Sequence, residues 1–184
     1  MGLPVRTENQ INGIQGIKSE ILDRNRLFVP RKVFFTSGTG SHEDELVSFE
    51  LALRDAGIER FNLVTVSSIF PPQCEIVEMD EGMRELYPGQ IVFCVMARET
   101  SNREGEKIYS TIGCAVPEDQ SLHGYLTEYH GVYRGGDVGR KAEESAKFML
   151  ETAFGVRTGR TFSITKIADV RECTTVVSAA VFVL

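Results

Sequence analysis

The chain has 184 residues, of which 42% are hydrophobic and 25% charged, a composition typical of a globular protein that can bury a sizeable core. Its formal net charge of −6, with no basic run, argues against a nucleic-acid-binding surface. The four cysteines are scattered singly, with no C-x-x-C spacing and no nearby histidine cluster, so the sequence predicts reduced, buried thiols and no metal site.

Residues 1–31 carry isoleucines at roughly helical spacing among polar residues, which is compatible with a short amphipathic helix or a loose arm. We interpret them as an N-terminal extension without chemistry. They lack the apolar core of a secretory signal, and the longest apolar run, residues 176–184, is far shorter than the ~20 residues that span a bilayer. The sequence therefore predicts a cytoplasmic protein that does not contact membranes.

Residues 32–36 are predicted to form a short strand that leads into a glycine-rich turn, S-G-T-G-S at 37–41, ahead of a helix. Such a turn can bind phosphate, because free N–H groups and the helix dipole favour an anion. However, the turn lacks the lysine and third glycine of a Walker motif, and three following carboxylates would repel phosphate. The alternative is a helix start with Ser41 as N-cap and Asp44 three residues later.

The helix is predicted to run from about residue 43 to residue 56, with Gly57 ending it. Its predicted apolar face consists of Leu46, Phe49, Leu53 and Ala56. Glu50 lies on or beside this face, which is costly for a carboxylate unless a cation meets it. Arg54 at i+4 is one partner, exposure at the edge of the face is a second explanation, and a cationic substrate group is the functional alternative.

Residues 62–72, N-L-V-T-V-S-S-I-F-P-P, form a β-branched run that contains two adjacent serines and is stopped by two prolines. The β-branched residues favour a strand, whereas Pro71 and Pro72 lack the N–H that a central strand needs. The Ser67–Ser68 peptide is therefore expected at a strand end, where backbone strain can be held. A serine pair by itself is common and indicates no function.

This run resembles the pyruvoyl-dependent arginine decarboxylases, as do the upstream D-A-G-I at 55–58 and the downstream E-I-V at 75–77. The resemblance covers about residues 32–182. It implies that the Ser68 hydroxyl attacks the Ser67 carbonyl, that the peptide becomes an ester, and that elimination and hydrolysis leave a pyruvoyl group on residue 68. Such a ketone forms a Schiff base with a substrate amine and is the electron sink that decarboxylation requires.

The same resemblance implies two further roles before the serines. Glu50 takes the position where the family usually presents an aspartate to the guanidinium of arginine, and Leu46 and Leu53 would lie along the methylene stem of that substrate. Asn62 matches a family asparagine that is tied to processing. Because Glu50 is one methylene longer than aspartate, a pyruvoyl decarboxylase for another amino acid is the alternative within enzymes.

Residues 89–97 and 107–117 are predicted strands, and the charged turn at 102–105 between them is typical of a hairpin. The acidic connection 78–88 shows no clear periodicity.

The segment 115–131 again resembles the family, which carries a glutamate in an E-Y-x-G setting that is Glu128 here. The resemblance implies that Glu128 donates the proton to Cα after carbon dioxide leaves. Such a donor must be protonated near neutral pH, so it needs an apolar or like-charged surrounding that raises its pKa. The residues that could supply this surrounding are Tyr125, Leu126 and Tyr129. We interpret His123 and His130 as surface or interface residues.

Asp137 is predicted to cap a helix that continues to about Phe154 and ends at Gly155. One face of this helix comprises Val138, Ala142, Ser145, Met149 and Ala153. Residues 162–168 form a predicted strand, and the apolar run 174–184 is expected to form another with both faces covered. Because helices do not alternate with strands, the fold class is α+β. The resemblance implies a four-layer αββα sandwich with mostly antiparallel sheets and the helices outside.

The sequence and the resemblance together predict an enzyme, a carbon–carbon lyase that converts L-arginine to agmatine and carbon dioxide, with no metal. Residues 32–184 would form the decarboxylase domain, cut between residues 67 and 68. A different class of protein is the remaining alternative, namely an unprocessed, non-catalytic oligomer subunit or a small-anion binding module.

The resemblance also bears on assembly. Asn62 and Ser68 are six residues apart, which in an extended strand is roughly 20 Å. If both act at one site, either the strand folds sharply or Asn62 serves the serine of a neighbouring subunit. The family is described as trimeric with sites between subunits, so we expect a closed trimer with three equivalent sites.

Overall fold

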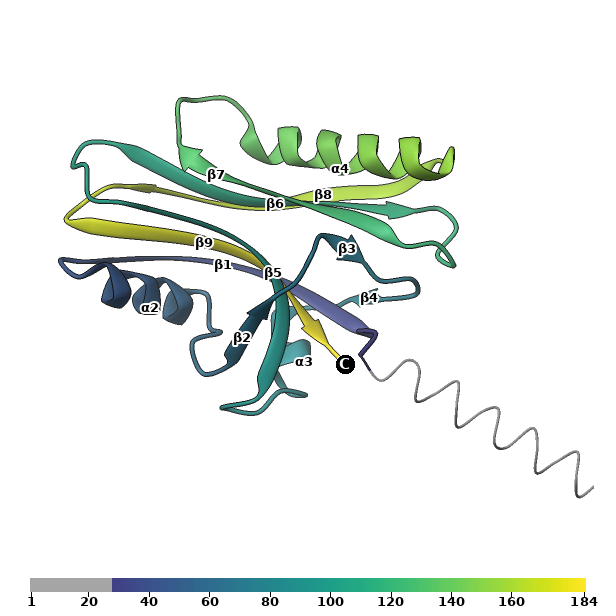
Figure 1. Ribbon diagram of the computed structural model, residues 1–184, viewed down its shortest axis with the longest axis horizontal. Coiled ribbons are helices and arrows are strands. Elements are labelled where there is room, and N and C mark those ends of the chain that lie inside the picture. The colour runs from purple at the N-terminus through teal and green to yellow at the C-terminus, as the bar shows by residue number, and fades with distance from the viewer. Residues whose placement is uncertain (1–27) are drawn as a thin grey trace, which may run out of the picture. The chain divides into compact units, whose positions relative to one another are not determined.

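The computed structural model describes residues 28–184, and residues 32–184 are built from two stacked β-sheets with helices outside them (Figure 1). The predicted N-terminal amphipathic segment lies outside the described residues, except for its last few positions. The elements in chain order are β1 (Lys32–His42), α2 (Glu45–Asp55), β2 (Asn62–Thr65), β3 (Ile69–Phe70), β4 (Glu75–Ile76), α3 (Met79–Met83), β5 (Ile91–Ser101), β6 (Lys107–Pro117), β7 (Gly124–Val132), α4 (Val138–Phe154), β8 (Thr158–Asp169) and β9 (Cys173–Val183).

One sheet has five strands in the order β2-β5-β9-β1-β4, and the other has four in the order β3-β7-β6-β8. Most neighbours are antiparallel, and β2–β5 and β1–β4 are the parallel pairs. Helix α2 covers the outer face of the five-stranded sheet and α4 covers the outer face of the four-stranded sheet (Figure 1). The predicted α+β class and four-layer αββα sandwich are therefore confirmed. No helix in this described part is long and apolar enough to cross a membrane.

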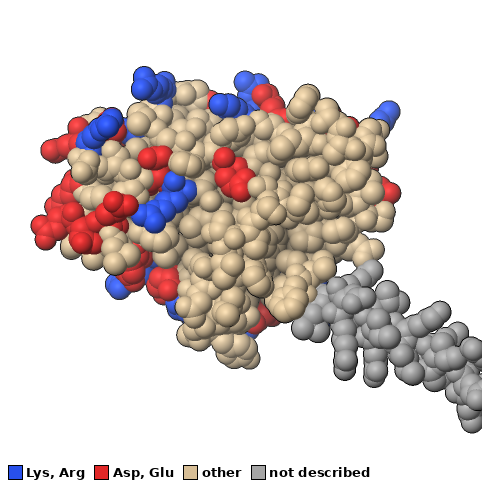
Figure 2. Space-filling model, in the orientation of Figure 1, with Lys and Arg blue, Asp and Glu red and all other residues tan. Residues whose placement is uncertain are grey.

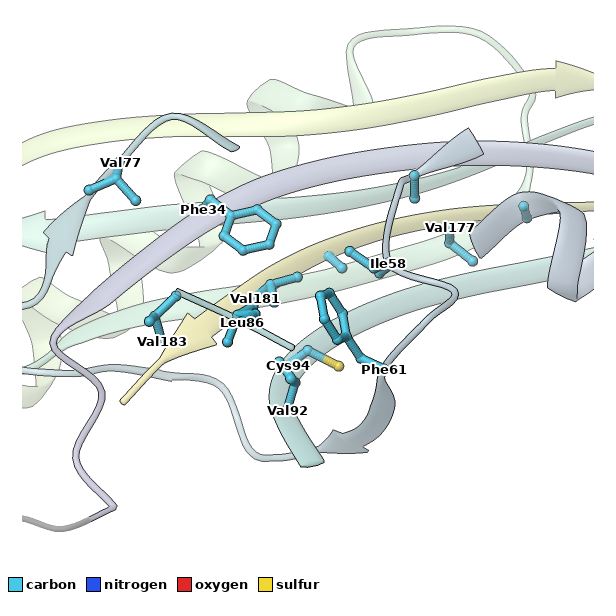
Figure 3. Packing of buried hydrophobic residues seen from close by; sticks show 13 residues of the cluster. Phe34, Ile58, Phe61, Val77, Leu86, Val92, Cys94, Val177, Val181 and Val183 are labelled. Carbon is cyan, nitrogen blue, oxygen red and sulfur yellow. The ribbon is translucent and has the colours of Figure 1, made fainter. Parts of the chain in front are cut away.

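The centre of the five-stranded sheet is buried on both sides. Strand β9 lies at its centre, and all eleven of its residues are buried, as the continuous apolar run predicts. Residues of β9, β1 and β5 pack on the helix side around Phe34, Ile58 and Phe61 (Figure 3). A second cluster, centred on Phe70, Leu126 and residues of β5 and β6, fills the space between the two sheets.

The predicted glycine-rich turn at 37–41 is wrong, because these residues belong to β1. The glycines have a packing reason instead. A Cβ on Gly38 would lie 2.2 Å from the carbonyl oxygen of Ala52, and one on Gly40 would lie 2.4 Å from that of Ser48. The absence of a side chain at these two positions lets α2 lie directly on the strand.

The predicted N-cap Ser41 is also wrong. Asp44 caps α2, and its carboxylate accepts a hydrogen bond from the Val47 backbone N–H at 3.0 Å. The buried face of α2 consists of Ser48 and Ala52, with the cap residue Ala56 beyond them, and Phe49 and Leu53 are only partly buried. Leu46 is 74% exposed, so its predicted place on the apolar face is wrong. Because α2 packs closely on the glycines of β1, the residues of α2 that face the strand are small, and Leu46 is not among them.

The predicted hairpin of β5 and β6 is wrong as well. Strand β5 pairs with β2 and β9, whereas β6 pairs with β7 and β8 in the other sheet. The turn at 102–105 therefore carries the chain from one sheet to the other. The two strands stack face to face through apolar side chains, Val95 and Ala97 from β5 and Ile112 and Cys114 from β6. Burying these faces against each other replaces edge-to-edge pairing.

Helix α4 has the predicted bounds. Asp137 accepts a hydrogen bond from the Arg140 N–H at 2.9 Å, and Gly155 ends the helix in the left-handed conformation. Its buried face is Gly139, Ala142, Ala146 and Leu150, so the predicted face was displaced by about one residue for much of its length. The connection 78–88, for which no structure was predicted, contains the short helix α3.

Candidate active site

The serine pair lies in a three-residue link between the two sheets. Strand β2 ends at Thr65 and is an edge strand of the five-stranded sheet, while β3 is an edge strand of the four-stranded sheet (Figure 1). The Val66 N–H donates to the Cys94 carbonyl of the first sheet at 2.9 Å. The Ser68 carbonyl accepts from Leu126 N–H of the second sheet at 2.9 Å. The serines therefore follow a strand end as predicted, but the strand is shorter than predicted.

Ser68 is directly beside a carboxylate. Its hydroxyl Oγ lies 2.7 Å and 2.8 Å from the two carboxylate oxygens of Glu128, and Ser68 is the donor. Glu128 is partly buried on β7, opposite Ile112 of β6, and faces the space between the sheets. A hydroxyl held on a carboxylate in this way can lose its proton as it attacks a neighbouring carbonyl carbon.

The Ser67 carbonyl, which the Ser68 hydroxyl would attack, accepts a hydrogen bond within the same turn. The Ile69 backbone N–H donates to the Ser67 oxygen at 2.9 Å, which closes a three-residue turn centred on Ser68. A donor on this oxygen stabilises the negative charge that develops there during attack. Sequence reasoning missed this contact, because β-branched residues around the serines predict an extended chain.

The serines and Glu128 open onto a pocket of about 420 Å³. Its lining consists of Ser67, Ser68, Ile69, Tyr125, Leu126, Thr127, Glu128, Tyr129 and Met149. The predicted neighbours of Glu128 therefore do gather around the same pocket. Thr127 Oγ1 donates to the Ala142 carbonyl at 2.8 Å, and Tyr129 donates to Ser145 Oγ at 3.1 Å, so α4 holds this edge of the pocket. Met149 is a lining residue that sequence reasoning did not assign to the site.

Asn62 is not joined to this pocket within the subunit. It begins β2, is exposed, and its side-chain amide donates to the Gly89 carbonyl at 2.6 Å. Within residues 28–184, no hydrogen bond links Asn62 to either serine or to Glu128.

The predicted substrate-binding residues are on α2 and do not line the serine pocket of the same subunit. Arg54 Nε donates to Glu50 Oε1 at 2.7 Å, so the internal i+4 partner weighed from the sequence is present. Both side chains are substantially exposed. Leu46 points to solvent, and Leu53 packs against the core under the helix.

The cysteines offer no competing nucleophile. All four are free. Burial raises the pKa of the Cys94 thiol to about 11 and that of Cys74 to about 12, and it raises the pKa of Cys114 strongly as well. These thiols are protonated at neutral pH and react poorly. Across the described residues 28–184, no group of three or more histidine, cysteine, aspartate or glutamate side chains could hold a metal ion.

A second, larger cleft of about 730 Å³ lies where β5 turns into β6, and its lining is strongly acidic. Its charged residues are Glu43, Glu45, Glu99, Glu106, Glu172 and Arg103. Figure 2 shows acidic side chains gathered at the left end of the molecule, where Figure 1 places the β5–β6 turn and the start of α2. None of the residues predicted from the sequence to form the active site lines this cleft.

Residues 32–184 match the family model described as pyruvoyl-dependent arginine decarboxylase. Two relatives from Archaeoglobus fulgidus carry that name. "Pyruvoyl-dependent arginine decarboxylase 1" is 67% identical over 85% of this chain and 99% of its own length. "Pyruvoyl-dependent arginine decarboxylase 2" is 57% identical over 85% of this chain and 98% of its own length. A Methanosarcina acetivorans relative of the same name is 52% identical over 85% of this chain and 97% of its own. A solved pyruvoyl-dependent histidine decarboxylase matches 54% of this chain and 53% of its own at 13% identity and a TM-score of 0.44, which is too low to carry an argument.

Proposed function

The chain belongs to the family of pyruvoyl-dependent arginine decarboxylases, and on that premise we propose that it cuts itself at Ser67–Ser68 and then converts L-arginine to agmatine and carbon dioxide. The observation that supports this best is the Ser68 hydroxyl held by Glu128 next to a hydrogen-bonded Ser67 carbonyl. A cytoplasmic location is part of the proposal and rests on the sequence alone.

Self-cleavage uses groups of the chain and one water molecule. Glu128 takes the proton of the Ser68 hydroxyl as Oγ bonds to the Ser67 carbonyl carbon, while the Ile69 N–H stabilises the oxygen. The C–N bond then breaks, its nitrogen takes a proton, and an ester links the two serines. A base then removes the Cα proton of residue 68 as the Cβ–Oγ bond breaks, which leaves a Cα=Cβ double bond at residue 68 and a carboxylate on Ser67. Water then replaces the nitrogen of residue 68, ammonia leaves, and a ketone remains at the new N-terminus.

The pyruvoyl group supplies the electron sink for decarboxylation when it is bound covalently at residue 68. The surrounding residues fit it, because residue 68 lies in a mainly apolar pocket with one carboxylate beside it. Tyr125, Leu126 and Met149 supply apolar surface to this pocket. Glu128 is placed to give a proton to Cα of the substrate after carbon dioxide leaves.

The substrate guanidinium is assigned to Glu50, and the methylene stem to Leu46 and Leu53. Glu50 and Leu46 are exposed on α2, and α2 lies on a different layer from the serine pocket. This separation supports a site completed by the α2 of a neighbouring subunit, in a closed trimer with three sites. Asn62 would likewise act in processing from a neighbouring chain.

The assembly is tested by mixing Asn62→Ala and Glu128→Gln subunits, each poorly active alone, after separating and reassembling them. Recovered activity would show that the two residues reach one site from different chains. Mixed oligomers verified by native mass spectrometry that stay inactive would place both residues in one subunit and defeat the trimer argument.

Self-cleavage is tested by intact mass and by gels of wild type and two variants. Wild type should give residues 1–67 and 68–184, the second with a carbonyl that reacts with hydrazine, and Ser68→Ala should remain one chain. Glu128→Gln keeps the size of the side chain but is not basic, so cleavage should slow by roughly 10²- to 10⁴-fold. A wild type that stays intact after long incubation and has no reactive carbonyl would overturn the proposal.

Another amino acid is the second candidate substrate, because Glu50 replaces the usual aspartate and already binds Arg54. Release of carbon dioxide from a panel that includes arginine, ornithine and lysine decides between them. A preference for a substrate without a guanidinium would overturn the assignment of arginine.

A further inference from the structure

Decarboxylation of arginine consumes one proton per turnover, because a carboxylate leaves as carbon dioxide and Cα receives H⁺. If Glu128 gives that proton, as the proposed function on which this inference rests requires, it must be recharged before the next turnover. At high pH free hydronium is scarce. Capture with a diffusion-limited rate constant of about 10⁹–10¹⁰ M⁻¹s⁻¹ supplies only about 1–10 protons per second at about pH 9, at or below the median enzyme kcat of about 10 s⁻¹.

Three alternate residues of β7 form a row on the face that looks toward the other sheet. The row consists of Glu128, His130 and Val132, and each of them pairs with an inward-facing residue of β6. The partner of His130 is Ser110, which is hydrogen-bonded to Ser178 of the five-stranded sheet. Alternate residues of a strand share a face and are about 7 Å apart along the chain. His130 therefore follows Glu128 directly on the same face.

This row runs between two cavities of the described residues. Glu128 lines the serine pocket, and Val132 at the other end of the row lines the acidic cleft of about 730 Å³. His130 lies between them. Glu99 of β5 also lines the acidic cleft, and its Oε2 is 2.8 Å from Nδ1 of His130. The His130 side chain is 53% exposed and that of Glu99 is 25% exposed, so the pair is in contact with solvent.

The contact with Glu99 orients the imidazole. A carboxylate on Nδ1 favours the tautomer with the proton on that nitrogen and leaves Nε2 free to accept and release a proton. The titratable groups that face His130 are Glu99 on β5 and Glu128 on its own strand, whereas Ser110 and Ser178 are uncharged. Tyr109 on β6 is close enough to Glu99 to be affected by its charge, although desolvation is the main reason that the pKa of Tyr109 is raised.

We infer that His130, oriented by Glu99, relays protons from the acidic cleft to Glu128 after each turnover. An exposed imidazole accepts protons from buffer acids, which are far more abundant than hydronium above neutral pH. The glutamates that line the cleft attract cationic buffer acids to its mouth. His130 is thus a relay residue that acts on the substrate through Glu128, directly or through one water.

The test compares single-turnover and steady-state decarboxylation of His130→Gln at several pH values. The variant should cleave itself normally, and its first turnover should be within about twofold of wild type, because the relay acts only after Glu128 has given its first proton. Steady-state kcat should match wild type at about pH 6 and fall by about tenfold or more at about pH 9, where hydronium capture limits the rate. Added imidazole should restore it. Glu99→Gln should also lower the steady-state kcat at about pH 9, by a smaller factor than His130→Gln.

His123→Gln is the matched control. His123 also belongs to the β7 region, but its ring packs against Tyr125 and Phe154 on the α4 side, and it should show neither the pH-dependent loss nor the rescue. If His130→Gln slows the first turnover as much as the steady state, or if imidazole does not restore it, His130 is structural and the inference fails. An unchanged kcat over the whole pH range also overturns it. A wild type that releases no agmatine refutes the proposed function instead.

Discussion

Substituting alanine for Gly38 tests whether the closeness of α2 to β1 positions the Glu50 carboxylate, to which the substrate guanidinium is assigned. A Cβ at this position would lie 2.2 Å from the Ala52 carbonyl oxygen and 2.5 Å from the Ala56 nitrogen, both backbone atoms. A carbon–oxygen contact needs more than 3 Å, so α2 must move outward by about 1 Å. Overpacking of this kind costs about 1–3 kcal/mol.

The effect of Gly38→Ala can be measured on thermal stability and on the KM for arginine. For a domain of this size, 1 kcal/mol shifts Tm by about 2–4 °C, so Gly38→Ala should lower Tm by about 2–12 °C, measured by circular dichroism in the uncleaved Ser68→Ala background. In the cleavable protein, the KM for arginine should rise by up to about 100-fold, because α2 carries Glu50 and an ångström of misplacement disturbs binding. Self-cleavage should be unaffected, since Ser68 and Glu128 are away from α2.

Gly105→Ala is the control. Gly105 lies in the β5–β6 turn at φ +85° with nothing within 4 Å of an added Cβ, so alanine there costs only backbone strain of about 1–2 kcal/mol. It should lower Tm without changing KM. If Gly38→Ala melts at or above the temperature of the parent and keeps its KM, the argument from close packing is wrong.

Three further outcomes are expected. Glu50→Gln should leave self-cleavage intact and raise the KM for arginine roughly 10- to 150-fold, the loss of one charge-assisted contact, whereas unchanged kinetics would assign Glu50 to its bond with Arg54. Lys166 holds the pKa of Asp55 below its ordinary value, so this carboxylate stabilises the fold above that ordinary value and the effect is lost as pH falls through the folded-state pKa. Asp55→Asn should therefore lower stability at about pH 7, by less than about 1 kcal/mol for so exposed a pair, and by progressively less as pH falls below the ordinary carboxyl pKa. A loss that stays constant over this range would exclude an ionic cause. Asp137→Ala should cost about 1 kcal/mol by removing the α4 N-cap, and a Tm equal to the parent would count against that assignment.

The sequence was enough to predict those elements that are determined by residues close together in the chain. Asp137 and Gly155 mark the ends of α4 by capping alone, and the unbroken apolar run of β9 requires cover on both faces. The serine pair at a strand end follows in the same way from the β-branched residues and prolines around it.

The errors arose where the answer depends on a partner distant in sequence. Two strands joined by a short turn can pair at their edges or stack on their faces, and the pattern of β5 and β6 is compatible with both. The glycines of β1 resemble a loop until α2 is seen lying on them. Likewise, strand parity relates His130 to Glu128, but nothing local indicates that Glu99 lies beside His130.

The pairing of β1 has a consequence for the cut protein. All eleven residues of β1 pair with β9, and β4 lies on its other side, so a strand from before residue 67 is held between two strands from after it. The five-stranded sheet is therefore complete only when both fragments are present, whereas the four-stranded sheet lies wholly within residues 68–184. If the chain cuts itself as proposed, folding must therefore come first, while the fragments are one molecule. The cut protein would then be a two-chain complex that, once denatured, can reassemble only by a second-order encounter. Its recovery from denaturant should depend on protein concentration, whereas the β1–β9 pairing of an uncut chain forms within one molecule.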